Sequence, residues 1–151
     1  MKTRYFLITL AISLIGLFSC KKSNNQATTV PISHWIINGV TDSSSTVSAA
    51  NNMNFVCMTS DQLKSISIDF FSKVVRSYTY KVSSTLNDST ECTLSVNDNT
   101  GLIYTSTGLT SDSLHETLSN NIITLTFNNI TVHNSTTTAL VSGVLNFQSV
   151  Y

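Results

Sequence analysis

The amino-acid sequence predicts an all-β chain that folds as a single antiparallel β-sandwich of about eight or nine strands, with a small β-barrel as the alternative. Short segments alternate apolar and polar residues with a period of two, which is strand geometry. Ser, Thr and Asn, which suit strands and turns, make up roughly two-fifths of the chain. No helical period extends beyond about two turns. The connections are too short for crossovers, and this favours antiparallel pairing.

Strands are predicted in order along the first half of the domain. The segment 35–39 opens the fold, and the Asp- and Ser-rich stretch 41–46 is predicted as the first loop. Apolar alternation marks the next strands at 53–57 and 66–70. Between them, 60–63 has an N-cap-like start and is predicted to form one helical turn.

The second half continues the same pattern with strands at 78–82, 92–96 and 102–104, the last two joined by a hairpin connection at 97–101. A tight turn is predicted at 119–121. The apolar positions of the following strand change from odd to even numbers across Asn128 and Asn129, which predicts a β-bulge. A final strand occupies 141–147.

The N-terminal segment resembles a bacterial lipoprotein signal. Lys2 and Arg4 precede an apolar run too short to span a bilayer, which ends in Leu-Phe-Ser-Cys at 17–20. This lipobox predicts a signal peptide at 1–19, a diacylglycerol on Cys20, a flexible tether within 20–30 and a domain at 31–151. The expected partner of the lipid on Cys20 is a membrane.

Charge excludes nucleic acid as a partner. Without Lys2 and Arg4, six basic residues remain against eight acidic ones, and the basic residues form no stripe. Cys57 and Cys92 remain after lipidation of Cys20. They are interpreted either as a disulfide closing a loop of about 35 residues or as two separate core thiols.

No catalytic or metal-binding residues are predicted, and no cofactor is expected. The three histidines lack an evident nucleophile, and His115 and Glu116, as neighbours on a strand, should face opposite sides. The segment 97–101 lacks most ligands of a calcium loop, and no spacing suits structural zinc. The aromatic residues are expected to pack in the core rather than to form a sugar-stacking platform; they are Trp35, Tyr78, Tyr80 and Tyr104.

Several short motifs resemble those of small β-sandwich lipoproteins of Bacteroidota, most of them of unknown function. These are the lipobox, the polar tether, Trp-x-x-Asn-Gly at 35–39, Tyr-x-Tyr at 78–80, Phe-Asn-Asn-Ile at 127–130 and Ser-Gly at 142–143. In that group, acidic residues after the lipidated cysteine accompany surface export. Lys21 and Lys22 occupy those positions here, and Lys21 also differs from the aspartate that retains enterobacterial lipoproteins in the inner membrane. The resemblance therefore implies an outer-membrane anchor that faces the periplasm, with exposure at the cell surface as the alternative.

The resemblance also implies O-glycans at Ser89 and Ser113, because each follows an aspartate in a short motif of the kind these bacteria glycosylate. The function expected from all of these features is that of a non-enzymatic envelope module that binds a protein or a glycan. A lipocalin-like carrier of small ligands and, less well supported, a lipid-anchored hydrolase are the alternatives.

Overall fold

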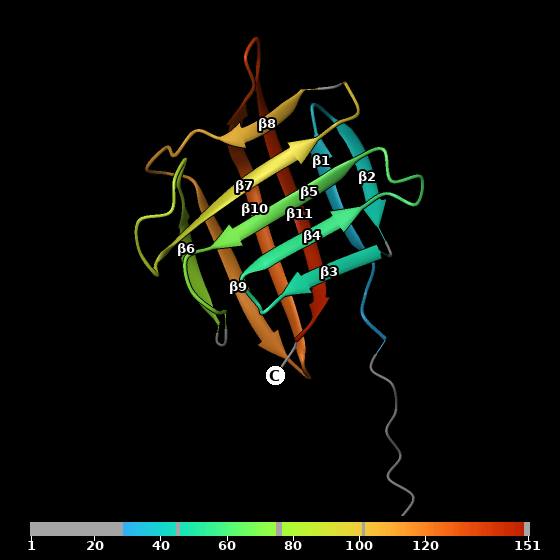
Figure 1. Ribbon diagram of the computed structural model, residues 1–151, viewed down its shortest axis with the longest axis vertical. Helices are drawn as coiled ribbons and strands as arrows, with labels where there is room; N and C mark the ends of the chain where they lie inside the picture. Colours follow the sequence, from blue (N-terminus) through green and yellow to red (C-terminus); the bar gives the residue numbers. More distant parts are fainter. Residues whose placement is uncertain (1–28, 45, 75–76, 101, 150–151) are drawn as a thin grey trace, which may run out of the picture.

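The computed structural model describes residues 29–44, 46–74, 77–100 and 102–149, and all regular structure in these ranges is β. The strands, shown in Figure 1, are β1 (Ser33–Ile37), β2 (Val40–Ser44), β3 (Thr46–Ala50), β4 (Asn54–Met58), β5 (Ser65–Phe70), β6 (Tyr78–Val82), β7 (Glu91–Asn97), β8 (Ile103–Ser106), β9 (Ser113–Ser119), β10 (Ile122–His133) and β11 (Thr138–Gln148).

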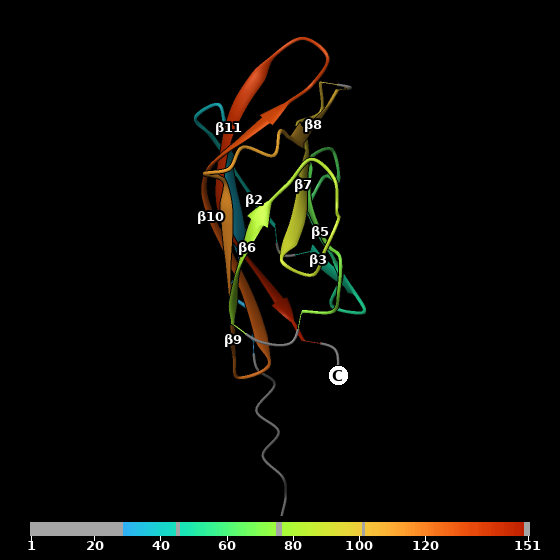
Figure 2. The same cartoon turned by 90° about the vertical axis from the view of Figure 1, so that its left-hand side faces the viewer.

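The strands form two layers that lie face to face, as Figure 2 shows from the side. One layer has the order β2-β1-β11-β10-β9-β6, and the other has the order β7-β5-β4-β3. β8 bridges the layers by pairing with both β7 and β10. The layers also meet where β6 pairs with β7, at Lys81 with Glu91 and Val82 with Cys92. The predicted all-β sandwich is confirmed.

Some local predictions are wrong. The segment 41–46 is no loop, because it contains most of β2 and the start of β3, the strands at the two ends of the sheet order. Edge strands rich in Ser and Thr show no apolar alternation. The predicted number of strands, eight or nine, is therefore lower than the eleven of the described residues. The β6–β7 pair is parallel, contrary to the antiparallel expectation. The stretch 60–63 forms a turn and not a helix, because the carboxylate of Asp61 accepts the Leu63 N–H at 3.0 Å.

Asparagine shapes the tight turns. Asn38 and Gly39 have φ values of 51° and 77° and join Ile37 to Val40 in a two-residue hairpin turn between β1 and β2. The predicted turn at 119–121 is confirmed, since Asn120 and Asn121 have φ values of 51° and 62°. The prediction that Gly39 belongs to the first strand is wrong, although Asn-Gly is itself a strong hairpin signal.

The core fills the space between the layers with aromatic and branched side chains. The ring of Phe55 on β4 meets that of Phe147 on β11 edge-on at 4.7 Å between centroids, which joins the two layers. Phe70 continues the contact, at 5.6 Å from Phe55 and 4.6 Å from Tyr80. Trp35, Tyr80 and Tyr104 are buried and Tyr78 packs against the core, so the expected core role of the aromatics is confirmed.

Gly143 on β11 lies opposite Trp35 on β1 and Phe127 on β10. A Cβ atom there would lie 2.8 Å from the His34 carbonyl oxygen, 2.8 Å from Phe127 Cζ and 3.1 Å from Trp35 Cβ. The missing side chain therefore leaves the room in which two aromatic residues pack across the glycine, an arrangement that also stabilises β-sheets elsewhere.

Replacing Gly143→Ala should lower the free energy of unfolding by about 2–3 kcal/mol, because the backbone oxygen of His34 cannot move aside without disturbing β1. Urea denaturation measures the effect. The comparison variant is Gly39→Ala, whose Cβ would meet nothing within 4 Å. It should cost only the backbone strain of a positive φ, about 1 kcal/mol. A Gly143→Ala protein as stable as the wild type would contradict the packing account.

The carboxylate of Glu91 accepts hydrogen bonds from the connection between β6 and β7. Ser83 Oγ donates to Oε1 at 2.8 Å, and the Asn87 N–H and Nδ2 donate to Oε2 at 2.9 and 3.1 Å. Lys81 Nζ lies 3.4 Å from Oε1. These donors, with the Ser83 hydroxyl contributing most, lower the pKa of Glu91 from 4.5 to about 2. The ionised carboxylate thus lies at the β6–β7 pair, where the two layers meet.

The lowered pKa of Glu91 makes the stability of the fold pH-dependent in acid. Its contribution is fully present above about pH 4.5 and is lost as the pH falls toward 2, because the unfolded chain then binds a proton that the folded chain resists. In urea denaturation at several pH values, the wild type should exceed Glu91→Gln in stability at pH 6, and the gap should shrink by pH 2.5. A gap independent of pH would show that the charge of Glu91 contributes nothing.

Candidate functional site

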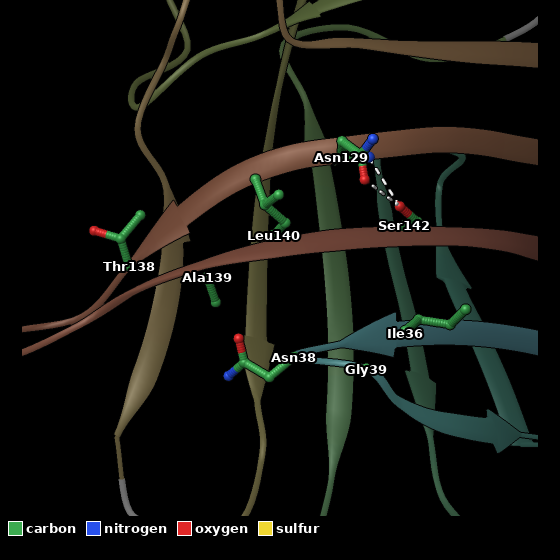
Figure 3. A pocket seen from close by; sticks show the side chains of 8 residues that line it. All are labelled: Ile36, Asn38, Gly39, Asn129, Thr138, Ala139, Leu140 and Ser142. Atoms are coloured by element: carbon green, nitrogen blue, oxygen red, sulfur yellow. Dashed lines mark hydrogen bonds between the residues drawn. The ribbon is translucent and has the colours of Figure 1, made fainter.

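A groove lies on the outer face of the layer that contains β1, β11 and β10, and we call it the bulge groove. Its volume is about 580 Å³. Figure 3 shows its lining, which comes from the β1–β2 turn, the start of β11 and the bulge of β10: Ile36, Asn38, Gly39, Asn129, Thr138, Ala139, Leu140 and Ser142.

The bulge that shapes this groove is confirmed where the sequence predicts it. The register of β10 with β11 shifts between Phe127 and Ile130, so Asn128 and Asn129 together lie opposite Ser142. Asn129 takes a φ of 53°, which asparagine tolerates better than most residues. Ser142 Oγ accepts the Asn129 N–H at 2.8 Å and donates to Asn128 Oδ1 at 2.9 Å. One hydroxyl thus satisfies a backbone donor that the bulge leaves out of the ladder.

A second hollow of about 280 Å³ continues the bulge groove along the same face. Ile36 and Ser142 line both hollows. The further lining residues of the second hollow are His34, Thr126, Phe127, Asn128, Gly143 and Val144. The two hollows together form one elongated surface across three neighbouring strands.

The lining combines aliphatic surface with neutral hydrogen-bonding groups. Leu140 is 54% exposed and Ile36 is 39% exposed, because both side chains lie on the outward face of the sheet. Asparagine amides and Ser and Thr hydroxyls surround them, and no Asp, Glu, Lys or Arg lines either hollow. Such a surface suits an uncharged ligand that has both apolar and hydrogen-bonding parts.

Sequence reasoning missed most of this groove. Ile36 and Leu140 are apolar residues on the outward faces of strands whose inward faces are already apolar, and that is the signal that could have revealed it. The sequence assigns Asn38 and Gly39 to the first predicted strand and Ser142 and Gly143 to the last one, and it predicts no groove between them.

A smaller hollow of about 150 Å³ contains charged groups near the β1–β2 turn. It is lined in part by Asp42, Lys64 and Asp98. Lys64 Nζ lies 2.9 Å from Asp42 Oδ1, so the cation at this place is already paired. Asp42 belongs to β2, and charged side chains on an edge strand discourage its pairing with another chain.

The sites predicted for modification fall in different places. Cys20 lies outside the described residues. Ser89 lies in an exposed turn after Asp88, whose Oδ1 accepts the Thr90 N–H at 2.7 Å. Ser113 is the exposed first residue of β9. Both serines are thus accessible side chains, and their glycosylation stays a prediction.

Cys57 and Cys92 are free and buried, and the structure therefore does not contain the disulfide considered from the sequence. Cys57 lies opposite Ile66 on β5, whereas Cys92 lies opposite Phe70, four residues further along the same strand. Four residues correspond to about 13 Å along a strand, well beyond the span of a disulfide. Burial raises the pKa of Cys57 to about 11 and that of Cys92 to about 12.

The histidines lie apart on the surface, at His34 on β1, His115 on β9 and His133 on β10. His115 Nδ1 lies 3.0 Å from Thr79 Oγ1, while its neighbour Glu116 is fully buried on the opposite face, as the strand period predicts. Among the residues that the structure describes, no group of three or more His, Cys, Asp or Glu side chains could hold a metal ion.

Comparison with protein-family models, curated proteins and solved structures finds no match for this chain. Within the described ranges, no helix has the length and apolar character needed to cross a membrane. The functional argument accordingly depends on the geometry of the groove and on the residues themselves.

Both buried thiols should resist modification in the native protein. At pH 8 the Cys20→Ser chain should show almost no reaction with a thiol reagent, because the raised pKa values suppress the reactive thiolate and burial blocks access. In denaturant without a reducing agent, both thiols should react. If none reacts under these conditions, the two cysteines are bonded to each other, which would contradict their separation along β5.

Proposed function

We propose that this chain is a lipid-anchored envelope lipoprotein whose β-sandwich binds a neutral glycan in the bulge groove without catalysing a reaction. The lipobox that ends at Cys20 supports the anchor. The observation that carries the binding role is the elongated groove itself, where exposed aliphatic side chains lie among amides and hydroxyls and no Asp, Glu, Lys or Arg lines either hollow.

A glycan suits this groove better than an extended peptide does. The groove lies on a sheet face, where the strand backbones are already hydrogen-bonded to one another, so side chains must satisfy the polar groups of the ligand. A peptide would bring a row of N–H and C=O groups for which an edge strand is the usual partner. Sugar hydroxyls match the amides of Asn38 and Asn129, and apolar C–H faces of a sugar match Ile36 and Leu140.

The placement of the groove also supports a display role. The chain enters β1 from 29–32 at one end of the sandwich, while the β1–β2 turn and the β10–β11 connection lie at the other end (Figure 1). Asn38 and Thr138, which line the groove, belong to that far end. A domain anchored through its N-terminus would thus present the groove away from the membrane.

The carrier alternative is less well supported, because the space between the layers is occupied by packed rings such as Phe55 and Phe147. A lipocalin-like carrier needs an interior cavity for its ligand. The hydrolase alternative lacks support from the described histidines, of which none has a carboxylate partner among its hydrogen bonds.

Leu140→Arg should weaken glycan binding about tenfold or more, a loss of roughly 1.4 kcal/mol, because a long charged side chain would fill the groove. The measurement is a titration of isotope-labelled Cys20→Ser chain with neutral glycans released from the envelope of the producing cell, followed by NMR. The expected shifts lie at the groove residues of β1, β10 and β11.

The matched control is Leu109→Arg, since Leu109 is 49% exposed and lies outside both hollows. It should bind as the wild type does. Shifts absent from the groove at every glycan concentration, or an equal loss in both variants, would refute the proposed binding site.

A further inference from the structure

One end of the sandwich gathers exposed apolar side chains from three separate segments. Ile32 in the segment before β1 is 66% exposed, Phe71 in the segment after β5 is 50% exposed, and Met53 in the β3–β4 turn is 38% exposed. In Figures 1 and 2 these three segments lie at the end where the chain enters β1, opposite the β1–β2 turn. We call the side chains of Ile32, Met53, Phe71 and Lys73 the entry rim.

Backbone hydrogen bonds fix two of these segments to each other. The Phe70 N–H donates to the Met53 carbonyl at 2.8 Å, and the Val74 N–H donates to the Asn52 carbonyl at 2.8 Å. Asn52 Nδ2 in turn lies 3.3 Å from the Ser149 hydroxyl at the end of β11. The segment after β5 and the β3–β4 turn are therefore held as one surface beside the end of β11.

The third segment is attached to the same end of β11. Asn146 Nδ2 donates to the Ile32 carbonyl at 3.4 Å, and the Asn146 N–H donates to the hydroxyl of Ser33 at 2.8 Å. Asn146 and Ser149 are separated by only three positions. The exposed apolar residues thus project from a common, hydrogen-bonded base and not from independent loops.

Charge is distributed unequally between the two ends. In the described part of the chain, Lys64 is paired with Asp42 and Lys81 with Glu91, whereas Lys73 beside Phe71 is exposed and has no acidic partner. Lys21 and Lys22 precede the same end in the sequence. The acidic residue nearest the rim along the chain is Asp69, which accepts a hydrogen bond from the Asn54 amide.

Acidic side chains gather at the far end instead. Asp42 and Asp98 line one hollow together with Asn38 of the β1–β2 turn, and Asp61 lies in the β4–β5 connection, whose Lys64 lines the same hollow. Val40, an exposed apolar residue of the far end, lines the same hollow as Asp42 and Asp98, whereas the entry rim combines exposed apolar side chains with Lys73. That combination complements anionic lipid headgroups.

The length of chain before the domain places the rim near lipid. Eight residues lie between Cys20 and Thr29, the first described residue, and an extended chain covers the nine Cα–Cα steps from Cys20 to Thr29 in at most about 30 Å. If Cys20 carries the lipid of the proposed function, the tether keeps Thr29, at the end of the domain that carries the rim, within this distance of the bilayer. At the resulting high effective concentration, a few weak contacts suffice for docking.

We propose that the entry rim is a second membrane contact, which docks on an anionic phospholipid surface with Phe71 and Ile32 inserted between headgroups and Lys73 paired with phosphate. The inference rests on the proposed lipid anchor at Cys20. Docking fixes the orientation of the domain, so that the bulge groove faces away from the bilayer instead of sampling all directions on a flexible tether.

Tryptophan placed at the rim tests the contact directly. The full lipidated chain with Phe71→Trp is reconstituted in phosphatidylglycerol-containing vesicles whose acyl chains are brominated and quench indole emission on contact. The expected result is a blue shift and a strong loss of emission relative to unbrominated vesicles. The control is Ile103→Trp on β8 near the far end, a position that is 61% exposed and should keep its emission.

Trp35 is fully buried and common to both variants, so it supplies the same background. Adding Lys73→Glu to the Phe71→Trp variant should reduce its quenching on anionic vesicles and leave it unchanged on vesicles of phosphatidylcholine alone. Equal quenching at positions 71 and 103, or none at either, would overturn the rim as a membrane contact.

An intact mass of the reconstituted protein separates the two proposals. A polypeptide mass without lipid would mean that the anchor at Cys20 fails, whereas a lipidated protein with an unquenched tryptophan at position 71 would mean that only the rim contact fails.

Discussion

The extra residue in β10 is the constraint on which both the core and the groove depend. β10 is twelve residues long and pairs with β11 on both sides of the irregularity. Its inward residues have odd numbers up to Phe127 and even numbers from Ile130, so a regular ladder would turn one of these two sets toward solvent. With Asn128 and Asn129 opposite Ser142, the whole strand buries its apolar side chains. The two asparagines are placed on the outward face, and the hydroxyl of Ser142 satisfies the displaced Asn129 N–H.

The groove therefore arises from a requirement of the core. A bulge bends its strand and increases the local twist, and the groove lies on the outer face at this bend, lined by Asn129 and Ser142. Gly143, next to Ser142, has the complementary effect on the inner face, because its missing side chain admits the rings of Phe127 and Trp35. Adjacent residues of β11 thus serve opposite faces. Changes that restore a regular ladder should remove the hollow and misplace the core together.

The sequence predicts the sandwich well wherever strands are buried on one face. Ile66, Ile68 and Phe70 alternate with polar residues and form β5 as expected, and the parity change at Asn128 and Asn129 locates the bulge. The edge strands could not be found in this way, because β2 and β3 each have one neighbour and bury few side chains. The groove also escaped prediction, since it combines outward residues of β1, β10 and β11 that only the tertiary register brings together. The separation of Cys57 from Cys92 follows from that register too.

The two ends of the sandwich differ in a way that a purely structural domain would not require. Folding alone favours burial of side chains such as Phe71 and Ile32, and their exposure costs about 25 cal/mol for each Å² of apolar surface left in water. Hydrogen bonds to Asn52, Met53 and Ile32 nevertheless hold the segments that carry them in place. The far end instead has paired or acidic charges and the open groove. As the proposed lipoprotein, the domain would have two environments, lipid on one side and the aqueous envelope on the other. The charge of the domain matches that division, because the exposed Lys73 lies toward the proposed anchor, whereas Asp42, Asp98 and the neutral groove lie away from it.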